Sequence, residues 1–293
     1  MLIYNPKDWL TFIFRLHKSD TFRKLAPMLV VISLYSGIVA FLELEYLQLS
    51  ESSHVKNIPI MHSMLGFAIS MLLVFRTNTA YDRWWEGRKF WGQLVNSSRN
   101  LAMKISTFIK PEDSDAPAFF KALIPAYALA LHQHLRKDGF DEKRFGEIEY
   151  LKNLDFSKHI PNQIAKMMYE KTHQLYKQKI ITGEELLFFN SEMQSFADIC
   201  GACERIKNTP IPYSYSAFIK KFIFIYIMTL PFGYVFQLGY YVVPVVAFIF
   251  YVLASLEIIA EEIEDPFGDD ENDVPTDVLS ENIKKSVEEI MQT

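Results

Sequence analysis

The amino-acid sequence predicts an all-α integral membrane protein in which four transmembrane helices continue into a cytoplasmic helical bundle. Half of the 293 residues are hydrophobic and only 22% are charged. Long uncharged stretches have the length that a bilayer requires, and no segment shows the apolar–polar alternation expected of strands. Because the soluble part continues the membrane helices, we interpret residues 1–293 as a single domain.

Two uncharged stretches each fit one membrane crossing. Residues 25–42 give 18 uncharged positions in a row, and residues 57–75 give 19. A bilayer core about 30 Å thick needs about 20 residues of helix, at a rise of about 1.5 Å per residue. Each stretch is therefore expected to form one transmembrane helix.

A third stretch, residues 222–256, contains 35 uncharged positions and would be about 50 Å long as one helix. Proline and glycine in its middle can break it into a hairpin with spans at 217–236 and 240–257. The candidate breakers are Pro231, Gly233, Gly239 and Pro244. The alternative is a set of buried helices in a large soluble protein, whose core rarely contains so long an uncharged run.

Lysine and arginine predict a multi-pass protein of the inner (plasma) membrane with both termini in the cytoplasm. Basic residues precede the first and third spans and follow the second. They are Arg15, Lys18, Arg23, Lys24, Arg76, Arg83, Arg88, Lys89, Lys220 and Lys221. The connection 43–56 instead carries three acids and one lysine, and the tip between the last two spans has no charge. The long segment 76–212 is therefore also expected in the cytoplasm.

The segment 76–212 is expected to be entirely helical. No proline occurs from Ile60 to Ile109, so the second span is predicted to run on beyond Phe75 as one helix. Further amphipathic helices are predicted at 116–137, 161–180 and 184–207, separated by proline- or glycine-containing breaks.

Charge is segregated along the chain. Residues 1–256 have 28 basic and 22 acidic residues, whereas residues 257–293 have two lysines and 13 acids. This excludes a uniformly basic nucleic-acid binder. The acids cluster in Glu261-Glu-Ile-Glu-Asp-Pro-Phe-Gly-Asp-Asp-Glu-Asn-Asp273. Such carboxylates can hold a hard cation, or residues 261–293 can form a solvated acidic turn and tail, and both interpretations stay open.

The chain offers little to support an enzyme. Cys200-Gly-Ala-Cys203 is a CxxC motif, which can be redox-active or supply half of a zinc site, but no second pair accompanies it. Two thiols packed on a helix is the favoured interpretation. His132 and His134 are two residues apart and so lie on different helix faces, which argues against a metal pair there.

The second span carries an apolar stripe. Phe67, Met71 and Phe75 recur at i, i+4 and i+8, on one side of a helix. Small residues on neighbouring faces permit close helix approach: Ser63, Gly66, Ala68 and Ser70. The stripe is either an ordinary packing surface or a hydrophobic constriction formed when several copies line a common axis.

Three segments together resemble the bestrophin family in a bacterial form. They are Phe75-Arg-Thr-Asn-Thr-Ala-Tyr-Asp-Arg-Trp-Trp-Glu-Gly-Arg88, Cys203-Glu-Arg-Ile-Lys-Asn-Thr-Pro-Ile-Pro212 and Glu264-Asp-Pro-Phe-Gly-Asp-Asp-Glu-Asn-Asp273. The resemblance covers nearly the whole chain, in order and at similar spacing.

The resemblance implies a homopentameric ion channel with a single axial pore, with the lipid bilayer and permeant monovalent ions as its other partners. The family is best known for chloride conduction, and some bacterial members prefer cations. Phe67, Met71 and Phe75 match the pore neck, where Phe67 and Met71 depart from the usual pattern of Ile and Phe. Glu184 matches the lower aperture, where the usual residue is apolar. No cofactor is required.

The acidic turn resembles the calcium clasp of animal bestrophins. The matching positions are Glu262, Asp265, Asp270 and Asp273. The clasp also uses a carbonyl from the N-terminal leader, here within Met1-Leu-Ile-Tyr-Asn-Pro6. The resemblance therefore implies a calcium ion at this turn, beside the alternative of a solvated tail.

Two other function classes stay open at this point. One is a membrane-bound redox or metal protein that uses Cys200, Cys203 and the histidines. The other is a helical scaffold that conducts nothing.

Overall fold

The computed structural model describes residues 21–47, 58–112, 114–136 and 140–292, and every regular element within these ranges is helical. The all-α prediction is thereby confirmed. The elements are α2 (Thr21–Phe41), the π-helical turn η1 (Leu42–Tyr46), α3 (Ile58–Phe108), α4 (Ala116–Leu135), α5 (Glu142–Gly146), η3 (Glu149–Leu151), α6 (Ile160–Lys177), α7 (Gly183–Asn208), α8 (Tyr213–Leu238), η4 (Gly239–Tyr241), α9 (Val242–Glu264) and α10 (Thr276–Ile290).

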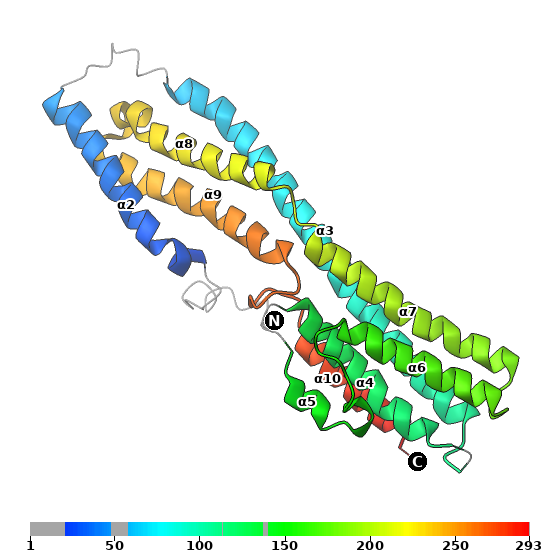
Figure 1. Ribbon diagram of the computed structural model, residues 1–293. Helices are drawn as coiled ribbons and strands as arrows, with labels where there is room; N and C mark the ends of the chain where they lie inside the picture. The colour runs from blue at the N-terminus through cyan, green and yellow to red at the C-terminus, as the bar shows by residue number, and fades with distance from the viewer. Residues whose placement is uncertain (1–20, 48–57, 113, 137–139, 293) are drawn as a thin grey trace.

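The molecule is elongated, with two helical layers of different character at its ends (Figure 1). At one end α8 and α9 pack against the first part of α3, and α2 packs against α8 and α9. At the other end α4, α7 and α10 pack against the second part of α3, and α6 packs against α4 and α7. Helix α3 is thus a single 51-residue rod, about 76 Å long, that joins both parts. The predicted continuation of the second span into the bundle is confirmed.

Three helical stretches are long and apolar enough to cross a membrane. They are Thr21–Tyr46, Ile58–Phe108 and Tyr213–Glu264. The third is folded into an antiparallel pair, α8 and α9, so it is the predicted hairpin (Figure 1). The chain is a membrane protein.

Only one of the four expected helix breakers breaks the hairpin. Gly239 has a φ of 54°, which L side chains rarely adopt, and it ends α8. Pro231 and Gly233 lie inside α8, where packing against neighbouring helices tolerates them. Pro244 lies in the first turn of α9, where an amide N–H has no helical partner to lose. The helices α8 and α9 are longer than the predicted spans 217–236 and 240–257, whose bounds within a membrane stay a prediction.

The acidic chain end after the turn contains a helix that the sequence analysis did not predict. Helix α10 places Ser280, Ile283 and Val287 on one buried face against α3 and α4. This spacing is the i, i+3, i+7 pattern of an amphipathic helix. Residues 276–290 are therefore part of the bundle.

Ion pairs join the last turns of α9 to the other membrane helices. Lys24 Nζ lies 2.5 Å from Glu262 Oε1, Lys220 Nζ lies 2.8 Å from Glu261 Oε2, and Arg76 Nη2 lies 2.6 Å from Glu264 Oε2. They lie where the apolar helices give way to the bundle, and we call this region the junction.

Candidate functional site

One face of α3 has no packing partner among the residues that the structure describes. Phe67, Met71 and Phe75 are exposed by 73%, 50% and 53%, although all three are large and apolar. The opposite face is buried against α8 and α9 by Ile69 and Leu73. The three predicted neck residues therefore share one large exposed apolar face, which is typical of a surface that contacts a partner or lipid. Their place in a pore stays a prediction.

The exposed face is longer than the sequence analysis expected. Met64 and Ile60 lie one and two turns before Phe67 and are exposed by 71% and 66%. Their spacing of three and four residues continues the same face. Ser63 and Ser70 donate their hydroxyl protons to the carbonyls of Ile60 and Gly66 on α3 itself. Because both hydroxyls donate to backbone carbonyls of α3, the exposed surface stays largely apolar.

Gly66 is needed where α3 meets α8. A Cβ at this position would lie 2.9 Å from the Tyr226 hydroxyl oxygen. The predicted role of a small residue in close helix approach is confirmed here.

Glu184 and its neighbour Glu185 have different environments at the start of α7. The Glu185 carboxylate accepts the Thr182 N–H at 2.6 Å, and Thr182 Oγ1 accepts the Glu185 N–H at 3.2 Å. This is a capping box, which fixes Glu185 on its own helix end. Glu184 is exposed in the first turn. Its carboxylate is thus the freer of the two to act on ions, and its place in an aperture stays a prediction.

The three segments that carry the family resemblance meet at the junction. The Glu264 carboxylate accepts hydrogen bonds from Arg76 Nη2 and from the Ile211 N–H, each at 2.6 Å. Arg83 donates to the carbonyls of Glu264, Ile206 and Thr209. Each of these contacts joins residues more than 50 positions apart, so the sequence analysis had no means of finding them.

The acidic turn between α9 and α10 is closed by its own backbone. Pro266 O accepts the Val274 N–H at 2.9 Å, and Asp270 O accepts the Asp273 N–H at 3.1 Å. Trp84 Nε1 donates to the carbonyl of Asn272 at 2.9 Å, which ties the turn to α3. Residues 265–273 are therefore an ordered part of the junction.

Two of the four predicted calcium ligands are in direct contact. Asp273 Oδ2 accepts the backbone N–H of Asp270 at 2.7 Å. Glu262 is linked to the turn by Asn272, whose Nδ2 donates to Glu262 Oε2 at 2.7 Å. Asp265 contributes its carbonyl, which accepts the Gly268 N–H at 3.3 Å. The predicted leader carbonyl lies outside the described residues, as do Arg15 and Lys18.

The chemistry of Asp273 fits a cation. The residue is 4% exposed, and its Oδ1 is buried with no hydrogen-bond partner in the described structure. Burial raises the pKa of Asp273 to about 7, and the nearby Asp270, Asp265 and Asp269 add to the effect. A buried carboxylate oxygen that lacks a partner is the kind of ligand that calcium takes.

Cys200 and Cys203 are free, buried thiols on α7. Burial raises the pKa of Cys200 to about 12 and also raises that of Cys203. Since the thiolate is the nucleophile and the metal ligand, these thiols are unreactive at neutral pH. The interpretation as packed thiols agrees with this environment.

Comparison with known proteins identifies a family. A family model described as bacterial/fungal bestrophin protein matches residues 1–289. A voltage-dependent anion channel-forming protein of Nostoc sp. is 35% identical over 245 residues, which is 80% of each chain. A protein of the same description from Escherichia coli K12 is 31% identical over 286 residues, covering 97% of this chain and 92% of the relative.

Solved structures agree. A crystal structure of a substituted form of a bacterial bestrophin homologue from Klebsiella pneumoniae superposes with a TM-score of 0.80 at 26% identity. The match covers 92% of this chain and 100% of the homologue.

Proposed function

Since the chain belongs to the bacterial and fungal bestrophin family, a family of ion channels, we propose that it forms a membrane channel that conducts anions. The observation that carries this proposal is the exposed apolar face of α3, from Ile60 to Phe75. A lone helix face of this kind needs a cover, and copies of the same helix around a common axis provide one. The relatives described as anion channel-forming proteins support the choice of ion.

The assembly that we propose is a homopentamer around one central pore. Helices α2, α8 and α9 and the first part of α3 cross the inner membrane, giving four crossings with both termini in the cytoplasm. The exposed apolar residues of α2, among them Val31, Leu34 and Ile38, then face lipid or a neighbouring subunit. The α4, α6, α7 and α10 bundle lies on the cytoplasmic side.

The neck is the proposed gate. Phe67, Met71 and Phe75 present no polar atom stronger than a thioether sulfur, so a narrow ring of them expels water. The edges of the Phe67 and Phe75 rings are electropositive, which favours anions over cations. Glu184 at the start of α7 acts in the opposite direction, because a ring of acids attracts cations. The ion preference is the balance between these two positions.

Calcium at the acidic turn is the proposed regulator. The proposed ligands are Glu262, Asp265, Asp270 and Asp273, and the buried Asp273 oxygen supports this proposal. The turn contacts α3 through Trp84, so an ion bound in the turn acts on the helix that is proposed to line the pore. A bound calcium ion would offset the negative charges of these neighbouring carboxylates.

Reconstitution into liposomes tests the channel. Purified protein should run at five times the 34.1 kDa chain mass and should carry chloride across a bilayer. In asymmetric potassium chloride, the reversal potential should lie close to the chloride equilibrium potential. A monodisperse pentamer that passes no ion would leave only the scaffold interpretation. Reversal at the potassium equilibrium potential would instead contradict anion conduction.

A further inference from the structure

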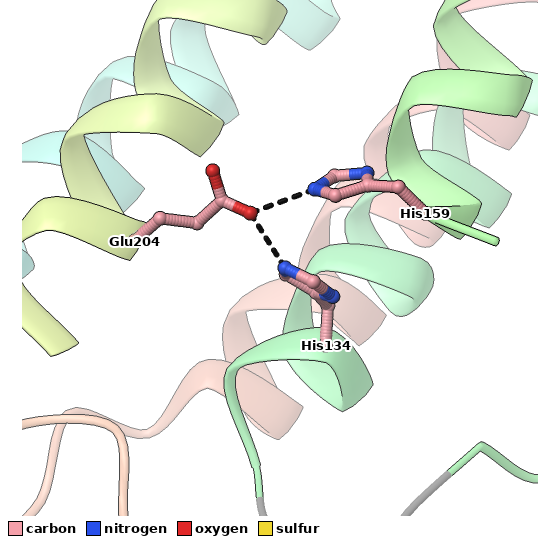
Figure 2. A group of neighbouring side chains, drawn as sticks. All are labelled: His134, His159 and Glu204. Atoms are coloured by element: carbon pink, nitrogen blue, oxygen red, sulfur yellow. Dashed lines mark hydrogen bonds and ion pairs between the residues drawn. The ribbon is translucent and has the colours of Figure 1, made fainter. Parts of the chain in front are cut away.

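Three side chains from distant parts of the bundle converge on one point (Figure 2). His134 lies in the last turn of α4, His159 directly precedes α6, and Glu204 lies near the end of α7. Glu204 Oε1 lies 2.6 Å from His134 Nε2 and 2.7 Å from His159 Nε2. The two imidazole rings are 4.3 Å apart between centroids. One possible ligand atom from each of the three side chains lies within 4.8 Å of the other two, and this is the group of His, Cys, Asp or Glu residues so arranged within the described ranges.

The protonation of the cluster suits a metal ion. Burial raises the pKa of Glu204, but the hydrogen bonds from His159 and His134 outweigh it and the pKa is lowered. Burial lowers the pKa of His134. Both shifts favour the forms of Glu204 and His134 that bind a metal ion, the carboxylate and the neutral imidazole.

We propose that His134, His159 and Glu204 bind a divalent transition-metal ion, with zinc as the ion that fits best. Two imidazoles and one carboxylate are a donor set that zinc uses with a water molecule at the fourth position. All three side chains are partly exposed, so an ion and that water can enter from solvent. This site is independent of the proposed channel activity and of the calcium site at the acidic turn.

Binding requires a small rearrangement. Donors about 2.1 Å from a tetrahedral ion lie about 3.4 Å apart, so the Glu204 carboxylate must withdraw slightly from both rings. His159 Nδ1 now accepts the Asn162 N–H at 3.1 Å, which places its ring proton on Nε2. Coordination through Nε2 moves this proton to Nδ1 and removes the N-cap of α6. The ion thus replaces a cap with a link among three helical segments.

Neighbouring groups are compatible with the ion. Lys207 Nζ donates to the carbonyls of His134 and Arg136, so its ammonium is held at backbone oxygens. Arg136 pairs with Asp269 in the acidic turn. Cys203 precedes Glu204, but its thiol is buried and its pKa is raised, so it does not compete as a ligand.

Zinc titration of the chelator-treated full-length protein tests the site. Wild type should bind one zinc per chain at this site, and the melting temperature should rise with saturation. Glu204→Gln and His159→Asn should each lose this equivalent or weaken it by at least about tenfold. Gln can still accept the histidine hydrogen bonds, and Asn is a strong N-cap, so both variants should fold. Gel filtration checks the fold of each variant.

Two controls separate this site from other ligands. His173→Asn removes an exposed histidine of α6 outside the cluster and should leave the zinc stoichiometry unchanged. Cobalt(II) in place of zinc should give visible bands of a four-coordinate ion without thiolate charge-transfer absorption, and Cys203→Ser should leave that spectrum unchanged. The proposal fails if wild type and Glu204→Gln bind the same number of zinc ions with equal affinity, or if cobalt shows thiolate ligation.

Discussion

Gly87 of α3 lies against Phe267 of the acidic turn. A Cβ at position 87 would lie 2.9 Å from Phe267 Cζ and 3.2 Å from Pro266 Cγ. Phe267 is buried, so its ring has little room to move away. Gly87→Ala should therefore push the turn off α3 and destabilise the protein by about 1–3 kcal/mol, as overpacked cores do. Thermal unfolding of the purified protein measures this.

Gly92→Ala is the matched control. It lies on the same helix, and its Cβ would meet only the end of the Arg88 side chain at 3.5 Å. Alanine is the better helix former by about 1 kcal/mol, so this variant should melt no lower than wild type. Equal melting temperatures for the two variants would show that a Cβ at position 87 does not clash with Phe267.

The membrane helices and the course of α3 could be predicted from sequence because both depend on local patterns. Uncharged stretches mark the spans, and the absence of proline from Ile60 to Ile109 allows α3 to continue. The spans expected at 217–236 and 240–257 place the hairpin break near the observed one, but which of the four candidate residues makes the break could not be predicted. Of these four residues, only Gly239 has a positive φ, and its conformation depends on how α8 and α9 pack.

The junction and the histidine cluster could not be predicted, because they depend on contacts between distant residues. Arg76 and Glu264 are 188 positions apart, and His134 and Glu204 are 70 apart. The sequence analysis compared His134 only with His132, its near neighbour on α4. His132 Nδ1 in fact bonds to Thr276 Oγ1 on the other side, at 2.7 Å. The exposure of Phe67, by contrast, agrees with the predicted stripe.

Truncation of the neck should increase ion flux. Phe67, Met71 and Phe75 replaced together by Ala would remove the large groups of the exposed α3 face while leaving its buried face intact. A wider and less apolar constriction holds water more readily, so conductance in planar bilayers should rise. Leu34→Ala with Ile38→Ala on the exposed face of α2 is the control and should leave conductance unchanged. Unchanged flux in a pentameric neck variant would remove α3 from the pore lining.

Neutralisation of Glu184 should shift selectivity toward anions. Glu184→Gln removes one exposed negative charge per subunit, and its effect on reversal potential should be larger at low salt, where screening is weak. Glu185→Gln removes the same charge one residue on, from a carboxylate that the capping box holds at Thr182. Its effect should be smaller. Equal permeability ratios in wild type and Glu184→Gln would place Glu184 away from the ion path.

Calcium should bind the acidic turn with a defined stoichiometry. Binding should saturate at one ion per chain and should raise the melting temperature. At a free calcium concentration a hundred times the dissociation constant, the free energy of unfolding should rise by about 2.7 kcal/mol. Asp270→Ala should abolish this rise, whereas Glu281→Ala, an exposed acid of α10, should retain it. Loose binding to a solvated acidic surface would instead be unsaturated and would weaken steeply with ionic strength.

The protonation of Asp273 should make stability depend on pH in the absence of calcium. Burial raises its pKa from the ordinary 3.8 to about 7. Between these values the folded state binds the proton that the unfolded state has released, so stability falls as pH rises through this window. Above pH 7 the folded protein holds a buried carboxylate whose Oδ1 has no hydrogen-bond partner in the described structure.

Asp273→Asn removes this titration while its Oδ1 can still accept the Asp270 N–H. In chelator, the melting temperature of wild type relative to Asp273→Asn should therefore fall between about pH 4 and about pH 8. Other titrating groups cancel in this comparison because both proteins contain them. Calcium at about pH 8 should restore wild type and not the variant, since the ion stabilises the ionised carboxylate. Parallel pH profiles of the two proteins in chelator would mean that Asp273 keeps its ordinary pKa, and the buried carboxylate could not then be the link between calcium and the turn.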